Sequence, residues 1–412
     1  MSFSQRCVSG AVRVLNAGGR ALRRLGANPP SLDAEDLLRA ARARAGLSAF
    51  GAWRFDEPLE RLLKSYRDEA RLTTLGRITA RELVVTLLEN LLLLEAERAR
   101  GPRIEQQRVA DPVFIVGLPR TGTTHLHGLV TQDPRNRAPL TWEVMFPAAR
   151  GARPAETAAV RARTASRLDW ANRLAPEFAR IHAIAADLPQ ECIAIQAQIF
   201  MSIQFHTTHA VPSYEDWFER DSQNLSYGFH HYLLQHLQAQ RPGDRWVLKA
   251  PGHLFGLGAL LRRYPNAKIV QTHRDPLRVM ASMASHACVL RRAFSDAADP
   301  KTIAADWTDR WTRALDDFLA GRDRAPADQF LDVAYESIER APLETIERVY
   351  DFLGWPLTED ARAAMQRFLT ANPKDKHGAH RYTLEEFGLD AITLRQRFSA
   401  YCERFAIRPH EG

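Results

Sequence analysis

The sequence predicts a three-layer α/β/α fold with a central parallel β-sheet, a P-loop-like phosphate loop and a helical N-terminal extension. Apolar residues recur at helical spacing in 33–100, which predicts helices without strands. After residue 105, short apolar segments alternate with helical segments, as in parallel sheets that are covered by helices. A glycine-bounded loop joins the first of these apolar segments to a helix. We therefore expect a helical extension at 1–105 and an α/β domain at 106–412.

Short apolar segments bounded by turn residues are typical of buried strands. The predicted strands cover 113–116, 246–249, 268–272 and 330–334. The helices expected after them cover 123–129, 253–263, a segment that begins at Pro276, and 342–353. Ligands of such sheets bind beyond the carboxyl ends of the strands. The segments that should meet there are 118–124, 249–253, 273–276 and 335–337.

The composition, with 45% hydrophobic and 25% charged residues, is that of a globular chain. The net charge of +7 fits arginines spread over solvated faces, and it also suits the attraction of an anionic small molecule. No basic block interleaved with aromatic residues predicts a nucleic-acid partner. The cysteines are far apart and form no CxxC pair: Cys7, Cys192, Cys288 and Cys402. This spacing predicts reduced thiols in the cytoplasm rather than disulfides or a zinc site.

No segment predicts a membrane-spanning helix. The apolar stretch at 83–94 is short and contains Glu89, so it is expected to be a buried helix. No signal peptide is expected either, because the N-terminus lacks a compact apolar region. Residues 1–27 contain five arginines and no acidic residue. Such a segment is either an amphipathic helix in peripheral contact with a membrane or a frayed basic terminus. The oligomeric state is not predicted.

The loop at 117–124 has the outline of a P-loop, GxxxxGK[ST]. Gly117, Gly122 and Thr124 are in register with this pattern, but Thr123 occupies the position of the lysine. Because that lysine pairs with the β- and γ-phosphates of a nucleoside triphosphate, we expect a nucleotide without a γ-phosphate.

Other groups of the same loop suit an anion. Arg120 places a cation inside the loop, and Gly122 lets backbone amides approach a phosphate at the start of a helix. The threonines add hydroxyl donors: Thr121, Thr123 and Thr124. A tight turn between strand and helix is the alternative, but an arginine and three threonines in one loop favour phosphate binding.

The segment Pro-Arg-Thr-Gly-Thr-Thr at 119–124 resembles the 5′-phosphosulfate loop of sulfotransferases, which use 3′-phosphoadenosine 5′-phosphosulfate (PAPS). The resemblance extends over about 113–405 and is nearest to the bacterial branch of the family. It implies that Arg120 contacts the transferred sulfate and the leaving phosphate. With Lys249 and the loop amides, Arg120 would supply the positive field that stabilises the developing charge.

A second set of residues resembles the nucleotide site of the same family. Arg274 and Ser282 resemble the pair that holds the 3′-phosphate, and the guanidinium fork suits a phosphate dianion. Tyr335 resembles the tyrosine that lies against the adenine. Lys376 and Gly378 resemble part of an Arg-Lys-Gly loop that closes on the 3′-phosphate. The alternative is that Arg274 is a surface residue paired with Asp275 and that Ser282 is an ordinary serine of a helix, with no ligand at either.

A general base must take the proton of the acceptor hydroxyl. Glu143 is the first candidate, because some sulfotransferases use a glutamate from this region. His253 is the second, although it stands four residues after Lys249 where the cytosolic branch has a histidine two residues on. A salt bridge for Glu143 and a packing role for His253 are the structural alternatives. No metal is expected, since the histidine pairs lack nearby cysteines or paired carboxylates.

The sequence thus predicts transfer of a sulfuryl group from PAPS to a hydroxyl of a small apolar acceptor, with release of 3′-phosphoadenosine 5′-phosphate (PAP). A small-molecule P-loop kinase is the second hypothesis, opposed by Thr123. A non-catalytic nucleotide-binding module is the third, opposed by the number of polar groups at one sheet edge. The aromatic residues of 199–232 form the core or line an acceptor pocket. A lipid, sterol, phenol or carbohydrate acceptor stays open.

Overall fold

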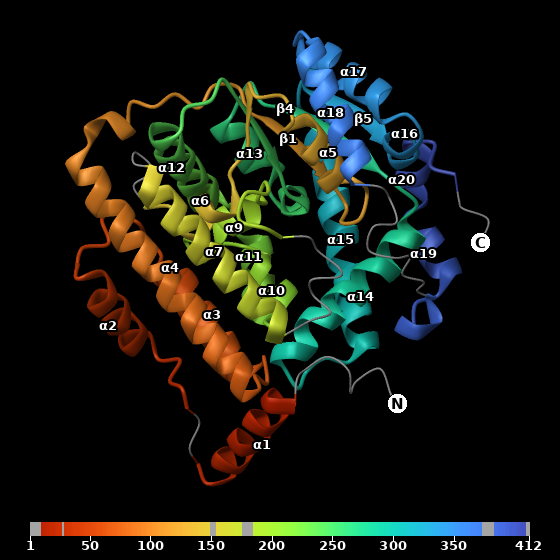
Figure 1. Ribbon diagram of the computed structural model, residues 1–412. Helices are drawn as coiled ribbons and strands as arrows, with labels where there is room; N and C mark the ends of the chain where they lie inside the picture. Colours follow the sequence, from red (N-terminus) through yellow and green to blue (C-terminus); the bar gives the residue numbers. More distant parts are fainter. Residues whose placement is uncertain (1–9, 27–28, 149–153, 175–183, 373–382, 409–412) are drawn as a thin grey trace.

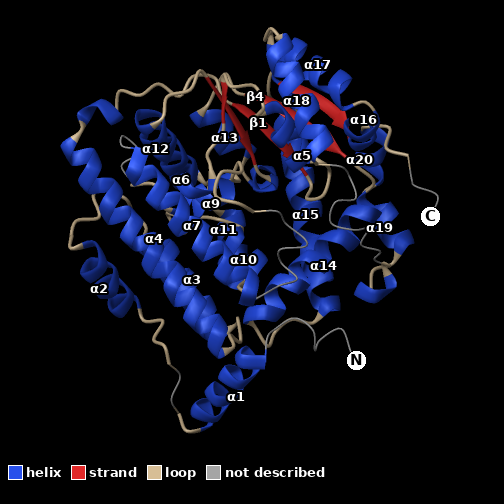
Figure 2. Cartoon of the chain, viewed as in Figure 1, coloured by secondary structure: helices blue, strands red, loops and turns tan. Residues whose placement is uncertain are grey.

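The computed structural model describes residues 10–26, 29–148, 154–174, 184–372 and 383–408. It contains a five-stranded parallel sheet in the order β2-β3-β1-β4-β5, whose strands are drawn in red in Figure 2. The strands are β1 (Val113–Gly117), β2 (Asn136–Arg137), β3 (Arg245–Lys249), β4 (Lys268–His273) and β5 (Phe330–Ala334). The four strands predicted from the sequence are confirmed. The strand β2 was not predicted, because two residues are too few to show a periodicity.

The two faces of the sheet belong to different hydrophobic clusters, because successive side chains of a strand point to opposite faces. On β1, Phe114 and Val116 pack into the larger cluster, whereas Val113 and Ile115 pack into the smaller one. Helices cover the smaller cluster: α5 (Thr123–Val130), α16 (Tyr335–Arg340), α17 (Pro342–Leu353) and α18 (Glu359–Ala371). The predicted three-layer α/β/α fold is therefore confirmed.

The larger cluster packs against the other face of the sheet and includes residues of most of the remaining helices. Most of these helices lie below β1 and β4 in Figure 1. The helices after β3 and β4 are α13 (Leu257–Arg263), α14 (Pro276–Phe294) and α15 (Pro300–Arg322). The predicted helix at 253–263 is in fact two pieces, a 3₁₀ turn (Pro251–Phe255) and α13. They are separated at Gly256, where a Cβ would lie 2.9 Å from the ring of Tyr227.

The N-terminal region is helical, as predicted, and residues of its second, third and fourth helices belong to the same cluster. Its helices are α1 (Gly10–Arg24), α2 (Ala34–Ala45), α3 (Asp56–Asp68) and α4 (Thr74–Arg100). Thr73 caps α4 by accepting a hydrogen bond from the amide of Gly76. The apolar stretch predicted to be a buried helix forms the middle of α4, with Leu88 and Leu91 in the core. The boundary at residue 105 stays a prediction.

The middle and C-terminal segments complete the helical layer around the larger cluster. The middle helices are α6 (Thr141–Met145), α7 (Pro154–Leu174), α9 (Cys192–Ala197), α10 (Gln204–Thr208), α11 (Pro212–Arg220) and α12 (Asn224–Gln240). The C-terminal ones are α19 (Ala391–Arg397) and α20 (Ser399–Arg404), and short 3₁₀ turns cover 102–104, 327–329 and 385–387. Within the described ranges, no helix is both long enough and apolar enough to cross a membrane.

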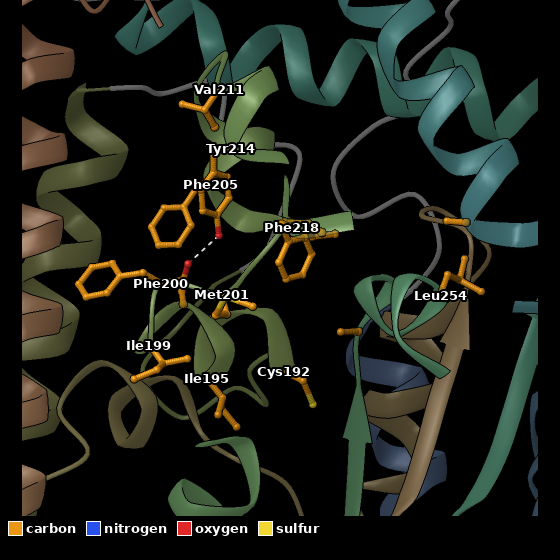
Figure 3. Close-up of a cluster of buried hydrophobic side chains, with 14 of the residues drawn as sticks. Cys192, Ile195, Ile199, Phe200, Met201, Phe205, Val211, Tyr214, Phe218 and Leu254 are labelled. Atoms are coloured by element: carbon orange, nitrogen blue, oxygen red, sulfur yellow. Dashed lines mark hydrogen bonds between the residues drawn. The ribbon is translucent and has the colours of Figure 1, made fainter. Parts of the chain in front are cut away.

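The aromatic segment at 199–232 forms part of the core. Phe200, Phe205, Tyr214 and Phe218 are buried together, and the Tyr214 hydroxyl donates a hydrogen bond of 2.7 Å to the carbonyl of Phe200 (Figure 3). None of these rings lines the cavity described next. Of the two interpretations of the aromatic segment, core packing is the one that fits these four residues.

Candidate active site

A cavity of about 790 Å³ lies at the carboxyl ends of the strands. All four segments that the sequence predicted to meet at this edge contribute to its lining. The loop after β1 contributes Arg120 and Thr124, and the loops after β3, β4 and β5 contribute Pro251, Arg274 and Tyr335. The strand register explains the convergence, since Gly117 pairs with Thr272 and the ends of neighbouring strands are level.

The loop 117–124 is held in shape by its own side chains and by β4. Gly122 has φ = 87°, a left-handed conformation that favours glycine, and it precedes α5 directly. The hydroxyl of Thr121 donates to the carbonyl of Leu118 at 2.7 Å and lies 2.6 Å from the hydroxyl of Thr272. Thr121 is fully buried and does not line the cavity, so its hydroxyl fixes the loop, whereas Thr123 and Thr124 border the cavity.

Four residues from three sequence motifs lie together at the cavity, and three of them line it: Arg120, Arg274 and Tyr335. The Nε atom of Arg120 donates to the hydroxyl of Ser282 at 3.2 Å. The carbonyl of Arg120 accepts a hydrogen bond of 2.8 Å from Arg274. The guanidinium of Arg274 lies 3.8 Å from the centre of the Tyr335 ring. Arg120 has φ = 69°, which is uncommon for a residue other than glycine and is held by these contacts.

Lys249 lies at the end of β3 and is 98% buried. Its ammonium group donates to the hydroxyl of Thr124 at 3.1 Å and pairs with the carboxylate of Glu191. Glu191 precedes α9 and lines the cavity. The hydrogen bond from the amide of Gln190 to the carbonyl of Pro139 fixes this segment beside the start of α6. Glu191 was not predicted from the sequence, because a single carboxylate beside Pro189 belongs to no motif with a recognisable spacing.

The position of Glu143 does not suit the base that the sequence predicted there. Its carboxylate is 1% exposed and accepts hydrogen bonds from Arg137 at 2.8 and 3.1 Å and from Arg241 at 3.0 Å. Burial favours the protonated form, but the two guanidinium groups outweigh burial and lower the pKa of Glu143. Val144 and Met145 line the cavity and Glu143 does not. The ion pairs of Glu143 with Arg137 and Arg241 fit the alternative of a structural salt bridge.

The position of His253 does not suit the base either. It is fully buried, 2.8 Å from the hydroxyl of Tyr227, and its ring meets the edge of Phe114. Burial lowers the pKa of His253 to about 3, and the residue does not line the cavity. These contacts fit the packing alternative. Lys376 and Gly378 lie outside the described residues.

The wall of the cavity opposite the strand ends is largely apolar. It comes from α4, α9 and α14 and includes Leu83, Leu87, Ile193, Ala197, Met283 and Leu290. Glu82 also borders the cavity, where Arg44 and Arg167 pair with its carboxylate. Over the residues that the structure covers, no group of three or more His, Cys, Asp or Glu residues could hold a metal ion.

The fold and the site together define an α/β protein with a P-loop-like loop after the central strand of a parallel sheet. Residues 112–360 match the profile of the sulfotransferase family. The chain belongs to this family and is a transferase, as the resemblance of its motifs implied.

Characterised members and solved structures of mycobacteria are similar to this chain. The omega-hydroxy-beta-dihydromenaquinone-9 sulfotransferase Stf3 of Mycobacterium bovis is 25% identical over 304 residues, which cover 69% of this chain and 74% of Stf3. The crystal structure of sulfotransferase STF1 from Mycobacterium tuberculosis H37Rv has a TM-score of 0.80 and 32% identity, covering 89% of this chain and 98% of STF1. Sulfotransferase STF9 from Mycobacterium avium has a TM-score of 0.83 and 25% identity, covering 93% and 99%.

Proposed function

We propose that this protein transfers the sulfuryl group of PAPS to the hydroxyl of an apolar, lipid-like alcohol and releases PAP. The observation that carries the proposal is the group formed by Arg120, Arg274, Ser282 and Tyr335 beside the phosphate loop. Two arginines, a helix N-terminus and a serine hydroxyl at one sheet edge suit a ligand with two separate phosphate groups.

On the donor side, the loop amides, Thr123 and Thr124 hold the 5′-phosphosulfate. Arg274 and Ser282 hold the 3′-phosphate, and the Tyr335 ring lies against the adenine. Because the Tyr335 ring keeps the Arg274 guanidinium at 3.8 Å, the arginine fork is oriented before the ligand arrives. Lys376 and Gly378 close on the 3′-phosphate in this proposal.

At the point of transfer, the acceptor oxygen attacks the sulfur in line with the bond to the leaving phosphate. A new S–O bond forms as the bridging S–O bond breaks, and the bridging oxygen leaves on PAP with the bonding electrons. Arg120 and Lys249 stabilise the negative charge that grows on the bridging and equatorial oxygens. Glu191 takes the acceptor proton, because it borders the cavity and shares Lys249 with Thr124 of the phosphate loop.

The acceptor side is supported by the apolar wall of the cavity. Leu83, Leu87, Ile193 and Met283 offer no charged partner to an acceptor, so an alcohol with an apolar body fits better than a carbohydrate. The relative named after omega-hydroxy-beta-dihydromenaquinone-9 has such an acceptor. We place the reaction in the cytoplasm, in keeping with the free thiols of Cys192, Cys288 and Cys402.

The donor is tested by thermal stability, since a ligand that binds only the native state raises the Tm. PAP and PAPS should raise the Tm far more than ATP with magnesium. Equal shifts would favour the kinase and refute the proposal. Labelled PAPS with long-chain primary alcohols then tests transfer. Label in the alcohol is expected, whereas binding of PAPS without turnover of any alcohol would favour a non-catalytic module.

A further inference from the structure

The helix α1 presents large apolar side chains to solvent. Val14 is 74% exposed, Leu15 41%, Leu22 44%, and Leu25, directly after the helix, 82%. At 100° per residue these four side chains fall in one sector of about 100°, which faces away from the protein. A surface helix of a globular protein normally has polar residues on that side.

A basic stripe lies on the side of the helix away from this sector, about 150° from the centre of the sector on the same projection. Arg13, Arg20 and Arg24 are exposed and fall within about 40° of one another on the same helical projection. The sequence contains no acidic residue before Asp33, so no carboxylate of its own segment neutralises them. An apolar sector with arginines on the opposite, polar face is the arrangement of helices that lie in the plane of an anionic bilayer surface.

The inner face of α1 is already used for packing. Val12 is 3% exposed, and the side-chain oxygen of Asn16 accepts a hydrogen bond of 3.0 Å from the amide of Leu75 in the first turn of α4. A Cβ at Gly19 would lie 1.6 Å from the Thr74 hydroxyl, so the two helices approach closely there. The outward apolar sector therefore contributes little to this docking, least of all through Val14 and Leu25.

The place of α1 connects it with the acceptor cavity. The helix α1 packs on the first turn of α4, at the N-terminal end of that helix (Figure 1). Glu82 and Leu83 of the same α4 line the cavity, about 12 Å farther along the helix axis. Other large exposed apolar side chains, such as Trp170 and Ile392, stand singly on their helices. Single residues of this kind are ordinary on a protein surface.

We propose that α1 is an in-plane membrane anchor. Val14, Leu15, Leu22 and Leu25 enter the boundary between headgroups and acyl chains of an anionic bilayer, and the arginine stripe pairs with lipid phosphates. This places the first turns of α4, and with them the cavity wall, near a membrane that can hold an apolar alcohol. The anchor goes beyond the proposed transfer reaction, and its binding needs no PAPS.

The test is flotation of the full chain with vesicles of phosphatidylcholine alone or with 30 mol% phosphatidylglycerol, without nucleotide. The wild type should bind the anionic vesicles at least about tenfold more tightly than the neutral ones. V14E/L22E should lower binding at least about tenfold, and R13Q/R20Q/R24Q should remove the preference for anionic lipid. I392E is the matched control, because Ile392 is also exposed and apolar but lies on α19. It should bind like the wild type.

Both multiple variants alter only outward side chains, so their Tm and their PAP-induced stabilisation should match the wild type. Absence of wild-type binding would overturn the proposal, as would equal binding by V14E/L22E. Light scattering after gel filtration measures the oligomeric state and so tests whether a second copy of the chain binds this apolar face instead. A dimer that V14E/L22E dissociates, with no vesicle binding, would assign this face to a second copy of the chain. Loss of sulfuryl transfer with intact vesicle binding would refute the proposed function alone.

Discussion

Replacing Glu143 by glutamine separates a structural role of this carboxylate from a catalytic one. The substitution keeps the shape of the side chain and removes its charge. It leaves Arg137, whose side chain is 1% exposed, without a carboxylate, since Glu143 is its ion-pair partner among the described residues. The Arg137 guanidinium would keep its contact with the Trp246 ring at 4.6 Å and its hydrogen bonds to backbone carbonyls.

The expected loss of stability follows from burial. Removing one partner of a buried ion pair costs about 3–5 kcal/mol. Arg241 is 45% exposed and can be solvated by water, and glutamine still offers one oxygen, so we expect about 3 kcal/mol. With an unfolding entropy of about 2.1 cal/mol/K per residue, a chain of 412 residues should lose about 3–4 °C in Tm.

Thermal unfolding and initial rates below the Tm measure the two roles side by side. Glu143→Gln should unfold earlier and keep kcat within about threefold of the wild type. Glu191→Gln is the matched comparison and should lower kcat by roughly a hundredfold, the usual scale for loss of a general base. An unchanged Tm together with a hundredfold loss of kcat in Glu143→Gln would refute this reasoning and return the base to Glu143.

Three further predictions concern the donor site and the buried histidines. Arg274→Ala should weaken PAP at least about tenfold in calorimetry but adenosine 5′-phosphosulfate, which lacks the 3′-phosphate, less than threefold; equal losses would contradict the assignment. Arg120→Ala should lower both kcat and donor affinity, because the charge of Arg120 stabilises the bond that breaks. A loss of affinity with an unchanged kcat would show that Arg120 does not stabilise the transition state. Burial lowers the pKa values of His127, His209 and His253 to about 3, below about 6.5 in the unfolded chain. The unfolded state therefore binds more protons, and the free energy of unfolding should fall as the pH drops from 6.5 towards 3. His253→Gln should flatten this fall in urea titrations, and an unchanged slope would contradict the assignment.

The sequence predicted most of the sheet because buried parallel strands have a local pattern. Apolar runs between turn residues mark β1, β3, β4 and β5. The phosphate loop is also local, since its glycines, Arg120 and threonines occupy one segment. The contact between Arg120 and Ser282 joins two motifs and could be expected only because both follow strands of one parallel sheet.

The proposed base, Glu191, could not be predicted from the sequence, because the burial and the partners of a carboxylate decide whether it can take a proton. Glu143 and His253 stand at plausible distances from the motifs along the chain, yet one is enclosed by two arginines and the other by aromatic rings. Glu191 reaches Lys249 through a loop that pairs with the segment before α6. Such a contact between distant segments leaves no periodic trace in the sequence.

Part of the cavity wall belongs to α4, so substitutions on this helix can change which acceptor fits. The groups proposed to hold PAPS come from the strand ends, whereas Leu83, Leu87 and Asn90 come from a helix outside the region matched by the family profile. Substitutions on this helix reshape the acceptor half while the donor half keeps its residues. Chimeras that exchange α4 between relatives should therefore exchange alcohols and retain their affinity for PAP.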